Sequence, residues 1–302
     1  MNAVLNQRAM DGVLLIDKPD AISSAEVVRR IKARVKPARV GHLGTLDPFA
    51  TGLLPILIGQ GTKLAQFLEQ GDKQYQGTIV LGAETDTLDR CGEIVRTATV
   101  PSLDRSALAR IAARFTGRIE QVPPLFSAIK RGGVPLYKLA RRGGPVEPAP
   151  ARAVDIVRLE LEAVDDSSLR FDVVCSPGTY IRSLARDIGV ALGSAAHLAE
   201  LQRLRSSGFS VESAFALDDA LVRITNGDTS VVIGTREALA SMAEVVVDEA
   251  VRNRLYNGDW AALDCVRTED LSPFKVICDG DLVAIAEMGI NHRASLLRVF
   301  SA

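Results

Sequence analysis

The chain has few of the residues that build metal or disulfide sites. Its four cysteines, Cys91, Cys175, Cys265 and Cys278, are scattered, with no C-x-x-C pair and no His at zinc-ligand spacing beside them. We therefore expect reduced thiols, no structural metal and no metal cofactor.

Long apolar runs are also absent. No segment approaches the ~18 apolar residues of a membrane span, and the opening MNAVLNQRAMDG lacks the basic start and apolar run of a signal peptide. We expect a soluble cytoplasmic protein with no membrane partner. The length of 302 residues favours about two domains, each with its own core.

The net charge of −1 hides two unlike parts. Residues 212–302 contain 8 Lys and Arg against 15 Asp and Glu, net −7, so residues 1–211 carry +6. Six bases fall within residues 29–39 and five within residues 130–142, both without an acid. Either cluster alone is typical of a solvated surface, but together they favour a polyanion such as RNA as partner.

Apolar periodicity predicts a mixed α and β chain in which hairpins outnumber parallel crossovers. A capping box formed by Ser23 and Glu26 opens one of the helices. The Gly- and Pro-rich residues 117–152 are predicted to leave the main sheet, and short β-like runs after residue 245, with an Asp279-Gly280 turn, predict a small, mostly β module. The expected strands are 12–17, 75–81, 159–161 and 169–175, and the expected helices are 24–36, 105–115 and 180–193.

The segment GHLGTLDPFATG (41–52) holds one acid, Asp47, among small and apolar residues. One interpretation is an Asp-Pro turn in which Asp47 caps backbone amides. The other is a functional carboxylate, because a carboxylate held against apolar surface needs a cationic partner or a task. Arg182, in CSPGTYIRSLARDIG, is the candidate partner, and Tyr75 and Tyr180 offer flat faces on which a base could stack, although either could be core.

Five motifs, in order, resemble those of the bacterial tRNA pseudouridine-55 synthases, the TruB family, over residues 11–210. They are VLLIDKP, GHLGTLDPFATG, QYQGTIVLGAETDTLDRCG, PPLFSAIKRGGVPLYKLAR and CSPGTYIRSLARDIG. The resemblance implies an α+β fold with a mixed, mostly antiparallel sheet and flanking helices. It also implies a catalytic domain over 1–245, with a basic, RNA-clamping insertion at about 123–151, and a small β-barrel-like, PUA-like RNA-binding module over 246–302.

The resemblance also implies the activity: isomerisation of uridine 55 in the T-loop of tRNA to pseudouridine, with base flipping and without cofactor, metal or an obligatory protein partner. Asp47 would be the catalytic aspartate and Arg182 its salt-bridge partner, which keeps it ionised. Tyr75 would stack on the target base and handle the proton at C5. The remaining implied roles are His42 lining the T-loop site, Lys18 and Pro19 packing beside the active site, and Asp89 making polar contacts there.

The chemistry leaves the role of Asp47 open. The carboxylate could attack the sugar, add to the base ring or remove a sugar proton. The acid-free cluster in the insertion leads us to expect that Arg131, Lys138, Arg141 and Arg142 grip phosphates. Two departures from the family pattern are Ala21, where Gly is common, and Pro177, where Lys is frequent, which removes one expected phosphate contact.

Other functions fit less well. GQGTK (59–63) lacks the Gly-Lys-Ser/Thr order of a phosphate loop, and the ligands of a zinc deaminase are missing. The alternative from another class is a non-catalytic factor of the same fold that binds the tRNA elbow. Basic clusters fit that alternative equally, and only Asp47, Arg182 and Tyr75 together argue against it. A guide-RNA-dependent relative is the alternative among enzymes.

Overall fold

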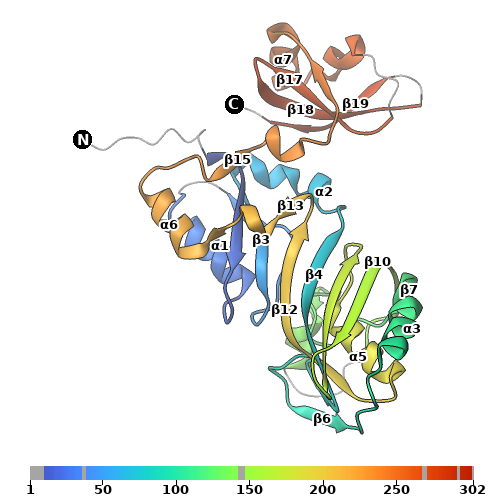
Figure 1. Ribbon diagram of the computed structural model, residues 1–302. Coiled ribbons are helices and arrows are strands. Elements are labelled where there is room, and N and C mark those ends of the chain that lie inside the picture. Colours follow the sequence, from blue (N-terminus) through green and yellow to red (C-terminus); the bar gives the residue numbers. More distant parts are fainter. Residues whose placement is uncertain (1–9, 36–38, 142–146, 267–270, 291–292, 301–302) are drawn as a thin grey trace.

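One long, curved sheet forms the body of the protein, and a smaller sheet lies at one end (Figure 1). The computed structural model describes residues 10–35, 39–141, 147–266, 271–290 and 293–300. The strands of the main sheet are β1 (Gly12–Lys18), β2 (Val40–His42), β3 (Thr51–Ile58), β4 (Lys73–Leu81), β7 (Gly117–Gln121), β10 (Arg152–Ala163), β11 (Ser168–Cys175), β12 (Ala196–Ser206), β13 (Phe209–Ser210), β14 (Phe215–Ala216) and β15 (Val232–Gly234).

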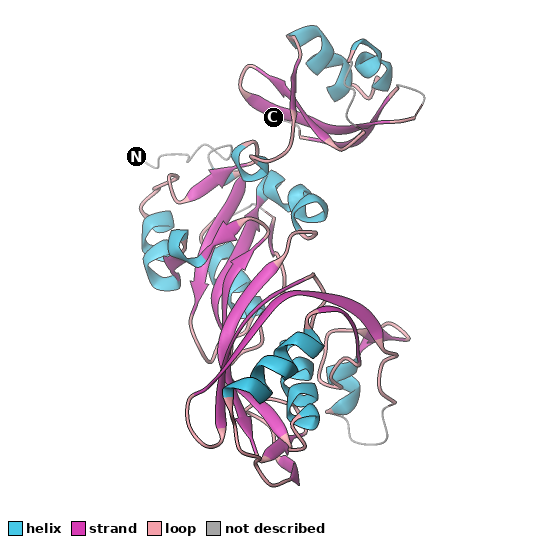
Figure 2. Cartoon of the chain, turned by 45° about the vertical axis from the view of Figure 1, so that its right-hand side comes forward, coloured by secondary structure: helices cyan, strands magenta, loops and turns pink. Residues whose placement is uncertain are grey.

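The order along the main sheet is β14-β1-β3-β12-β4-β11-β10-β7. Most neighbouring strands run antiparallel, whereas β1 with β14 and β3 with β12 run parallel. The remaining hairpin strands are β5 (Ala83–Thr85), β6 (Ile94–Thr97), β8 (Lys130–Arg131) and β9 (Val134–Pro135). The helices are α1 (Ser24–Lys32), α2 (Ala65–Leu68), α3 (Arg105–Phe115), α4 (Leu136–Ala140), α5 (Ile181–Ala191), α6 (Leu217–Thr225) and α7 (Glu249–Tyr256). The expected α+β fold, with a mostly antiparallel sheet and flanking helices, is confirmed (Figure 2).

Strands β1 and β3 are buried on both faces. Leu14 and Ile16 pack with α1, α5 and α6 in one core, while Val13 and Leu15 pack in a second core on the opposite face. A strand covered on both sides needs apolar residues at every position, which explains the unbroken runs VLLI and LLPILI. The loop between β2 and β3 is therefore attached to a strand that is packed on both faces.

Helix α1 begins where the capping box predicts, since the Ser23 side chain accepts a hydrogen bond from the Glu26 amide. It ends at Lys32, short of the expected residue 36. The last turn tightens, with the amide of Arg34 bonding to the carbonyl of Ile31, and the sequence has Pro37 just beyond, which disfavours helix in the residue before it.

The expected excursion over 117–152 begins later than predicted. Residues Gly117–Gln121 are β7, the edge strand of the main sheet, and they pair with β10. The chain leaves the sheet only after Gln121, then forms the β8–β9 hairpin and α4.

The C-terminal residues form a second sheet, in the order β16-β17-β18-β19. Its strands are β16 (Glu244–Val246), β17 (Phe274–Cys278), β18 (Asp281–Met288) and β19 (Ala294–Val299). Asp279 and Gly280 both have positive φ at the predicted turn. Helix α7 was not foreseen by the mostly β prediction: its sequence EAVRNRLY buries Leu255 alone among its residues.

The C-terminal sheet packs against the main body through the second core. Ile277, Leu282 and Ile285 lie in the same apolar cluster as Val13 and Leu57. Nζ of Lys63 also donates a 2.8 Å hydrogen bond to the carbonyl of Val299. Within the described residues, no helix is both long and apolar enough to cross a membrane.

Candidate active site

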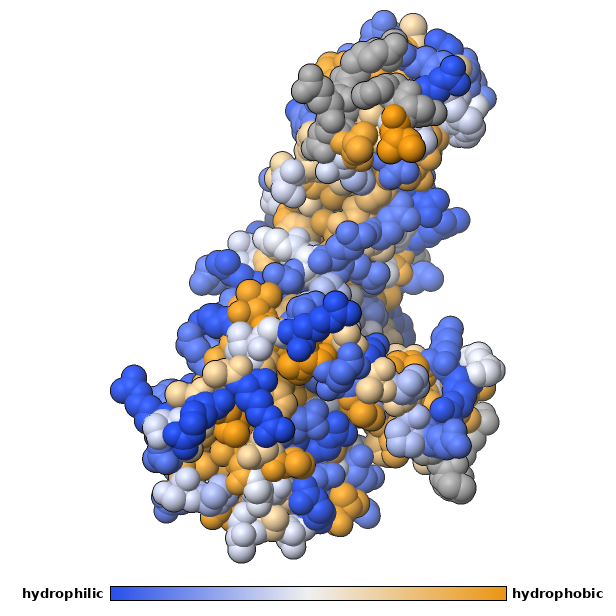
Figure 3. All heavy atoms as spheres, turned by 90° about the vertical axis from the view of Figure 1, so that its right-hand side faces the viewer, coloured by the Kyte–Doolittle hydropathy of each residue, from blue (hydrophilic) through white to orange (hydrophobic). Residues whose placement is uncertain are grey.

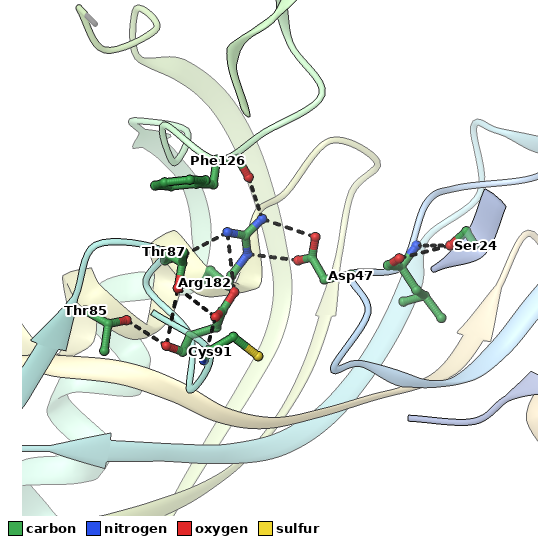
Figure 4. Close-up of polar contacts among 9 residues, drawn as sticks. Ser24, Asp47, Thr85, Thr87, Cys91, Phe126 and Arg182 are labelled. Atoms are coloured by element: carbon green, nitrogen blue, oxygen red, sulfur yellow. Dashed lines mark hydrogen bonds and ion pairs between the residues drawn. The ribbon is translucent and has the colours of Figure 1, made fainter. Parts of the chain in front are cut away.

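The carboxylate of Asp47 and the guanidinium of Arg182 meet in a two-point contact (Figure 4). Asp47 lies in the loop between β2 and β3, and Arg182 is the second residue of α5. Nε of Arg182 is 2.9 Å from Oδ2 of Asp47, and Nη2 is 3.3 Å from Oδ1. This fork matches the planar shape of the carboxylate and fixes its orientation.

Arg182 is held from three further directions. It is 5% exposed, and it donates hydrogen bonds to the carbonyls of Thr87 at 2.8 Å and Phe126 at 2.9 Å. Nη1 is also 3.6 Å from Oδ2 of Asp89. Arg182 thus joins the Asp47 loop, the loop before β6 and the start of the excursion at one point.

The Asp47 loop is anchored from α1. Oγ of Ser24 accepts a hydrogen bond from the amide of Leu46 and donates one to its carbonyl, both at 2.9 Å. Phe49 and Leu46 are buried, and the turn itself is closed by the amide of Ala50 bonding to the backbone carbonyl of Asp47. The turn uses the main chain of Asp47, so the carboxylate is left for Arg182.

Burial raises the pKa of Asp47, and Arg182 opposes this shift without overcoming it. The nearby carboxylate of Asp89 also raises the pKa of Asp47. Arg182 favours the ionised form, as expected, but loss of hydration outweighs its effect on the pKa. A carboxylate that is poorly solvated is the more reactive base or nucleophile.

Lys18 supports the loop from below. Its side chain is fully buried, and Nζ donates to the carbonyls of Pro19 and Ile22 at 2.8 Å and Pro48 at 3.1 Å. Burial lowers the pKa of Lys18 to about 8. Lys18 and the exposed Pro19 do not line the cavity around Asp47.

Activity is expected to fall as pH rises above about 8, because a neutral Lys18 has two N–H groups for three carbonyls. Because folding lowers the pKa of Lys18, the contribution of this group to folding stability is complete above the ordinary lysine pKa and is lost as pH falls through about 8. Stability therefore does not decrease as pH rises above 8, and the expected loss of activity there is not caused by unfolding. Lys18→Met should lower kcat about 10²-fold by displacing Pro48 and should remove this alkaline limb. The measurement is kcat against pH for both proteins; an alkaline limb unchanged in Lys18→Met contradicts the account.

A cavity of about 890 Å³ surrounds the ion pair. Its size suits a nucleotide and part of its neighbours. Figure 3 shows a hollow in the lower part of the molecule, between the main body and a smaller lobe. Of the candidate site residues named from the sequence, those lining the cavity are His42, Asp47, Tyr75, Asp89, Arg141, Tyr180 and Arg182.

Two tyrosines face this cavity. Tyr75 is 7% exposed, and burial raises the pKa of its hydroxyl. Leu201, on the neighbouring strand β12, lines the cavity beside it. The ring of Tyr180 carries the Arg152 guanidinium 4.7 Å from its centroid, so one of its faces is already occupied.

His42 and Asp89 differ in how far their hydrogen bonds are satisfied. Asp89 accepts from the Thr87 hydroxyl at 2.7 Å and the Cys91 amide at 3.0 Å. Nδ1 of His42 is buried and has no hydrogen-bond partner in the described part of the chain. Burial lowers the pKa of His42, so a neutral imidazole faces the cavity.

Of the basic residues in the excursion that the structure describes, only some lie at the cavity. Arg141 lines the cavity and lies over the ring of Tyr137 at 5.9 Å. Arg131 is 3.2 Å from Glu147 and, like the exposed Lys138, does not line the cavity. Arg142 lies outside the described residues.

The cavity residues that sequence reasoning missed include Thr87, Phe126, Leu201 and Arg203. Thr87 and Phe126 bind Arg182 through backbone carbonyls, which leave no trace in side-chain identity. Among the residues that the structure describes, no group of three His, Cys, Asp or Glu could hold a metal ion.

Ala21 adopts a left-handed conformation, with φ +66°. Oδ1 of Asp20 accepts a 2.6 Å hydrogen bond from its amide. A non-glycine residue costs about 1 kcal/mol in this conformation. Ala21 lies in the turn whose Pro19 and Ile22 carbonyls accept hydrogen bonds from Lys18, so this strained residue is part of the structure that holds Lys18.

Comparison with known proteins shows which family has sequences similar to this chain. Residues 30–181 match the family model of TruB family pseudouridylate synthase (N terminal domain). The tRNA pseudouridine synthase B of Syntrophotalea carbinolica is 44% identical over 304 residues, covering 97% of this chain and 98% of that protein. The same-named protein of Geotalea uraniireducens is 38% identical over 298 residues, covering 96% and 95%.

Among solved structures, Cbf5 in a Cbf5-Nop10-Gar1 complex matches with a TM-score of 0.72 and 22% identity, over 100% of this chain and 91% of that one. This likeness shows the shared fold and no more. The family match and the near full-length relatives establish the family: the chain belongs to the TruB pseudouridylate synthases, which are isomerases.

Proposed function

We propose that the protein is a tRNA pseudouridine-55 synthase that isomerises the uridine at position 55 of the T-loop. The names of its full-length relatives support tRNA as substrate. The observation that carries the proposal is the Asp47–Arg182 ion pair inside a nucleotide-sized cavity lined by Tyr75.

The reaction breaks the bond between C1′ and N1 of the uridine and forms one between C1′ and C5, with loss of the C5 proton. Asp47 would act at the reacting nucleotide, and each of its three possible roles needs the ionised carboxylate. Arg182 would hold that carboxylate in one orientation from both oxygens. Tyr75 would stack on the detached uracil and keep it in the cavity until it rotates.

A uridine inside a folded loop cannot reach a carboxylate at the foot of a cavity, so the target would be flipped out. The neutral His42, with its unbonded Nδ1, and Asp89 are suited to polar contacts with the flipped nucleotide and its neighbours. Arg152, stacked on Tyr180, would add a cation to the cavity lining.

The excursion after Gln121 would clamp the T-arm, and residues 246–302 would form a PUA-like RNA-binding module of a two-domain protein that works without an obligatory partner. Replacing Arg131, Lys138 and Arg141 together with Ala should reduce the slope of log affinity against log salt by about 2, since each lost phosphate contact removes about 0.7. Filter binding of a tRNA transcript across a salt series measures this. An unchanged slope contradicts the clamp.

The test of the proposed function is the position of the product. The protein alone, with a tRNA transcript, should form one pseudouridine at position 55, and a transcript with cytidine there should gain none. Binding of both transcripts without product would instead favour the tRNA-elbow binding factor.

A further inference from the structure

A second group of cations lines the cavity, separate from Arg182. Arg203, on β12, is 1% exposed. Nε donates to the carbonyl of Leu53 at 2.8 Å and Nη2 to that of Gly44 at 2.9 Å. Both partners are neutral, so the full positive charge of Arg203 remains beside the cavity, which is costly for a buried group.

Lys73, the first residue of β4, adds a second charge. Nζ of Lys73 makes no hydrogen bond or ion pair with the residues that the structure describes. Burial and the charge of Arg203 both lower its pKa. Cys175 and the exposed Glu69 raise that pKa, but Lys73 forms no ion pair with Glu69. Two partly desolvated cations repel each other unless they share an anion.

Gly44 lets both side chains reach the same stretch of the catalytic loop, three residues before Asp47. Its φ is +73°, and a Cβ there would lie 3.1 Å from Nη1 of Arg203 and 3.6 Å from Cε of Lys73. The unbonded Nδ1 of His42 lies two residues earlier. This wall of the cavity therefore carries positive charge and an unused imidazole nitrogen, whereas the Asp47 side carries two carboxylates that share one cation, Arg182.

Building on the proposed function, we propose that Lys73 and Arg203 form an anion subsite on this wall, and that it takes a backbone phosphodiester next to the reacting nucleotide. Lys73 contacts the phosphate, while the buried Arg203 holds the Gly44 turn and supplies the field. Asp47 and Asp89 share the single cation Arg182, so their side of the cavity keeps a net negative charge that disfavours a phosphate. The wall therefore also orients the nucleotide, with its sugar towards Asp47. The subsite differs from the excursion bases, since it lies on the rigid main sheet.

The experiment uses an RNA stem-loop with the T-arm sequence and a set of copies in which one phosphate at a time is a neutral methylphosphonate. Binding to the unaltered protein should weaken about tenfold at one loop phosphate, the loss of one charge-assisted contact. Lys73→Met should bind the unmodified RNA about tenfold more weakly, and a methylphosphonate at that position should weaken its binding no further. Lys73→Arg should again bind more weakly when that phosphate is neutral.

Arg110→Met, on α3 and away from the cavity, is the matched control and should keep the wild-type profile. The proposal is overturned if no methylphosphonate in the loop weakens binding to the unaltered protein. It is also overturned if the same methylphosphonate weakens binding to Lys73→Met as much as to the unaltered protein. Because binding is measured, a protein that shows this coupling yet forms no pseudouridine would retain the subsite and refute the proposed function.

Discussion

Asp47→Asn is expected to abolish pseudouridine formation, by a factor on the order of 10⁴ or more, while tRNA still binds. The substitution keeps the size of the side chain and removes its charge. Single-turnover assays with excess enzyme measure the chemical step, and filter binding measures the complex. Asp104→Asn, which changes an acid capping α3, is the matched control, because Asn caps a helix as well as Asp.

The same substitution should not destabilise the protein. The pKa of Asp47 is raised on folding, so its contribution to stability is complete below the ordinary carboxyl range and lost as pH rises through the raised value. At neutral pH the ionised group therefore costs stability, and Asn removes that cost. We expect thermal unfolding of Asp47→Asn at an equal or higher temperature at pH 7. A marked decrease would mean that the carboxylate is there to hold the fold.

Arg182→Met is expected to lower both activity and stability. It leaves Asp47 and Asp89 without their cation and the carbonyls of Thr87 and Phe126 without their donor. Breaking a buried ion pair typically costs about 3 kcal/mol in the free energy of unfolding, and loss of the orienting fork should reduce kcat about 10³-fold.

Two further variants separate the roles of Arg182. Arg182→Lys keeps the charge but cannot make the two-point contact, so stability should recover more than kcat. Arg186→Met, four residues later on α5, changes a more exposed arginine that pairs with Asp187 and should retain activity. Urea unfolding and single-turnover rates measure these effects. Full activity in Arg182→Met would exclude a role for the fork.

Strand β1 and the capped helix α1 could be predicted from the sequence, because an apolar run and a capping box are local signals. Strand β12 could not. In AHLAELQRLRS, Leu198, Leu201 and Leu204 repeat every three residues and resemble a helix face. The register against β4 shifts after Leu198 and again after Arg203, so the buried positions change phase at each bulge.

The candidate site was predictable only in part, for a related reason. The Asp47 and Arg182 side chains carry distinctive chemistry in recognisable motifs. Arg203 gives no such signal, because its partners are the carbonyls of Gly44 and Leu53, and any residue can supply a carbonyl. The direction of the Asp47 pKa shift was also hidden, since it depends on how completely Leu46 and Phe49 bury the loop.

The most direct test of the account is tritium release from tRNA transcribed with C5-tritiated uridine, because pseudouridine formation must expel that hydrogen. The account predicts release of about one tritium per tRNA by the unaltered protein and none by Asp47→Asn at equal tRNA occupancy. Binding without release by the unaltered protein, or equal release by Asp47→Asn, would contradict it.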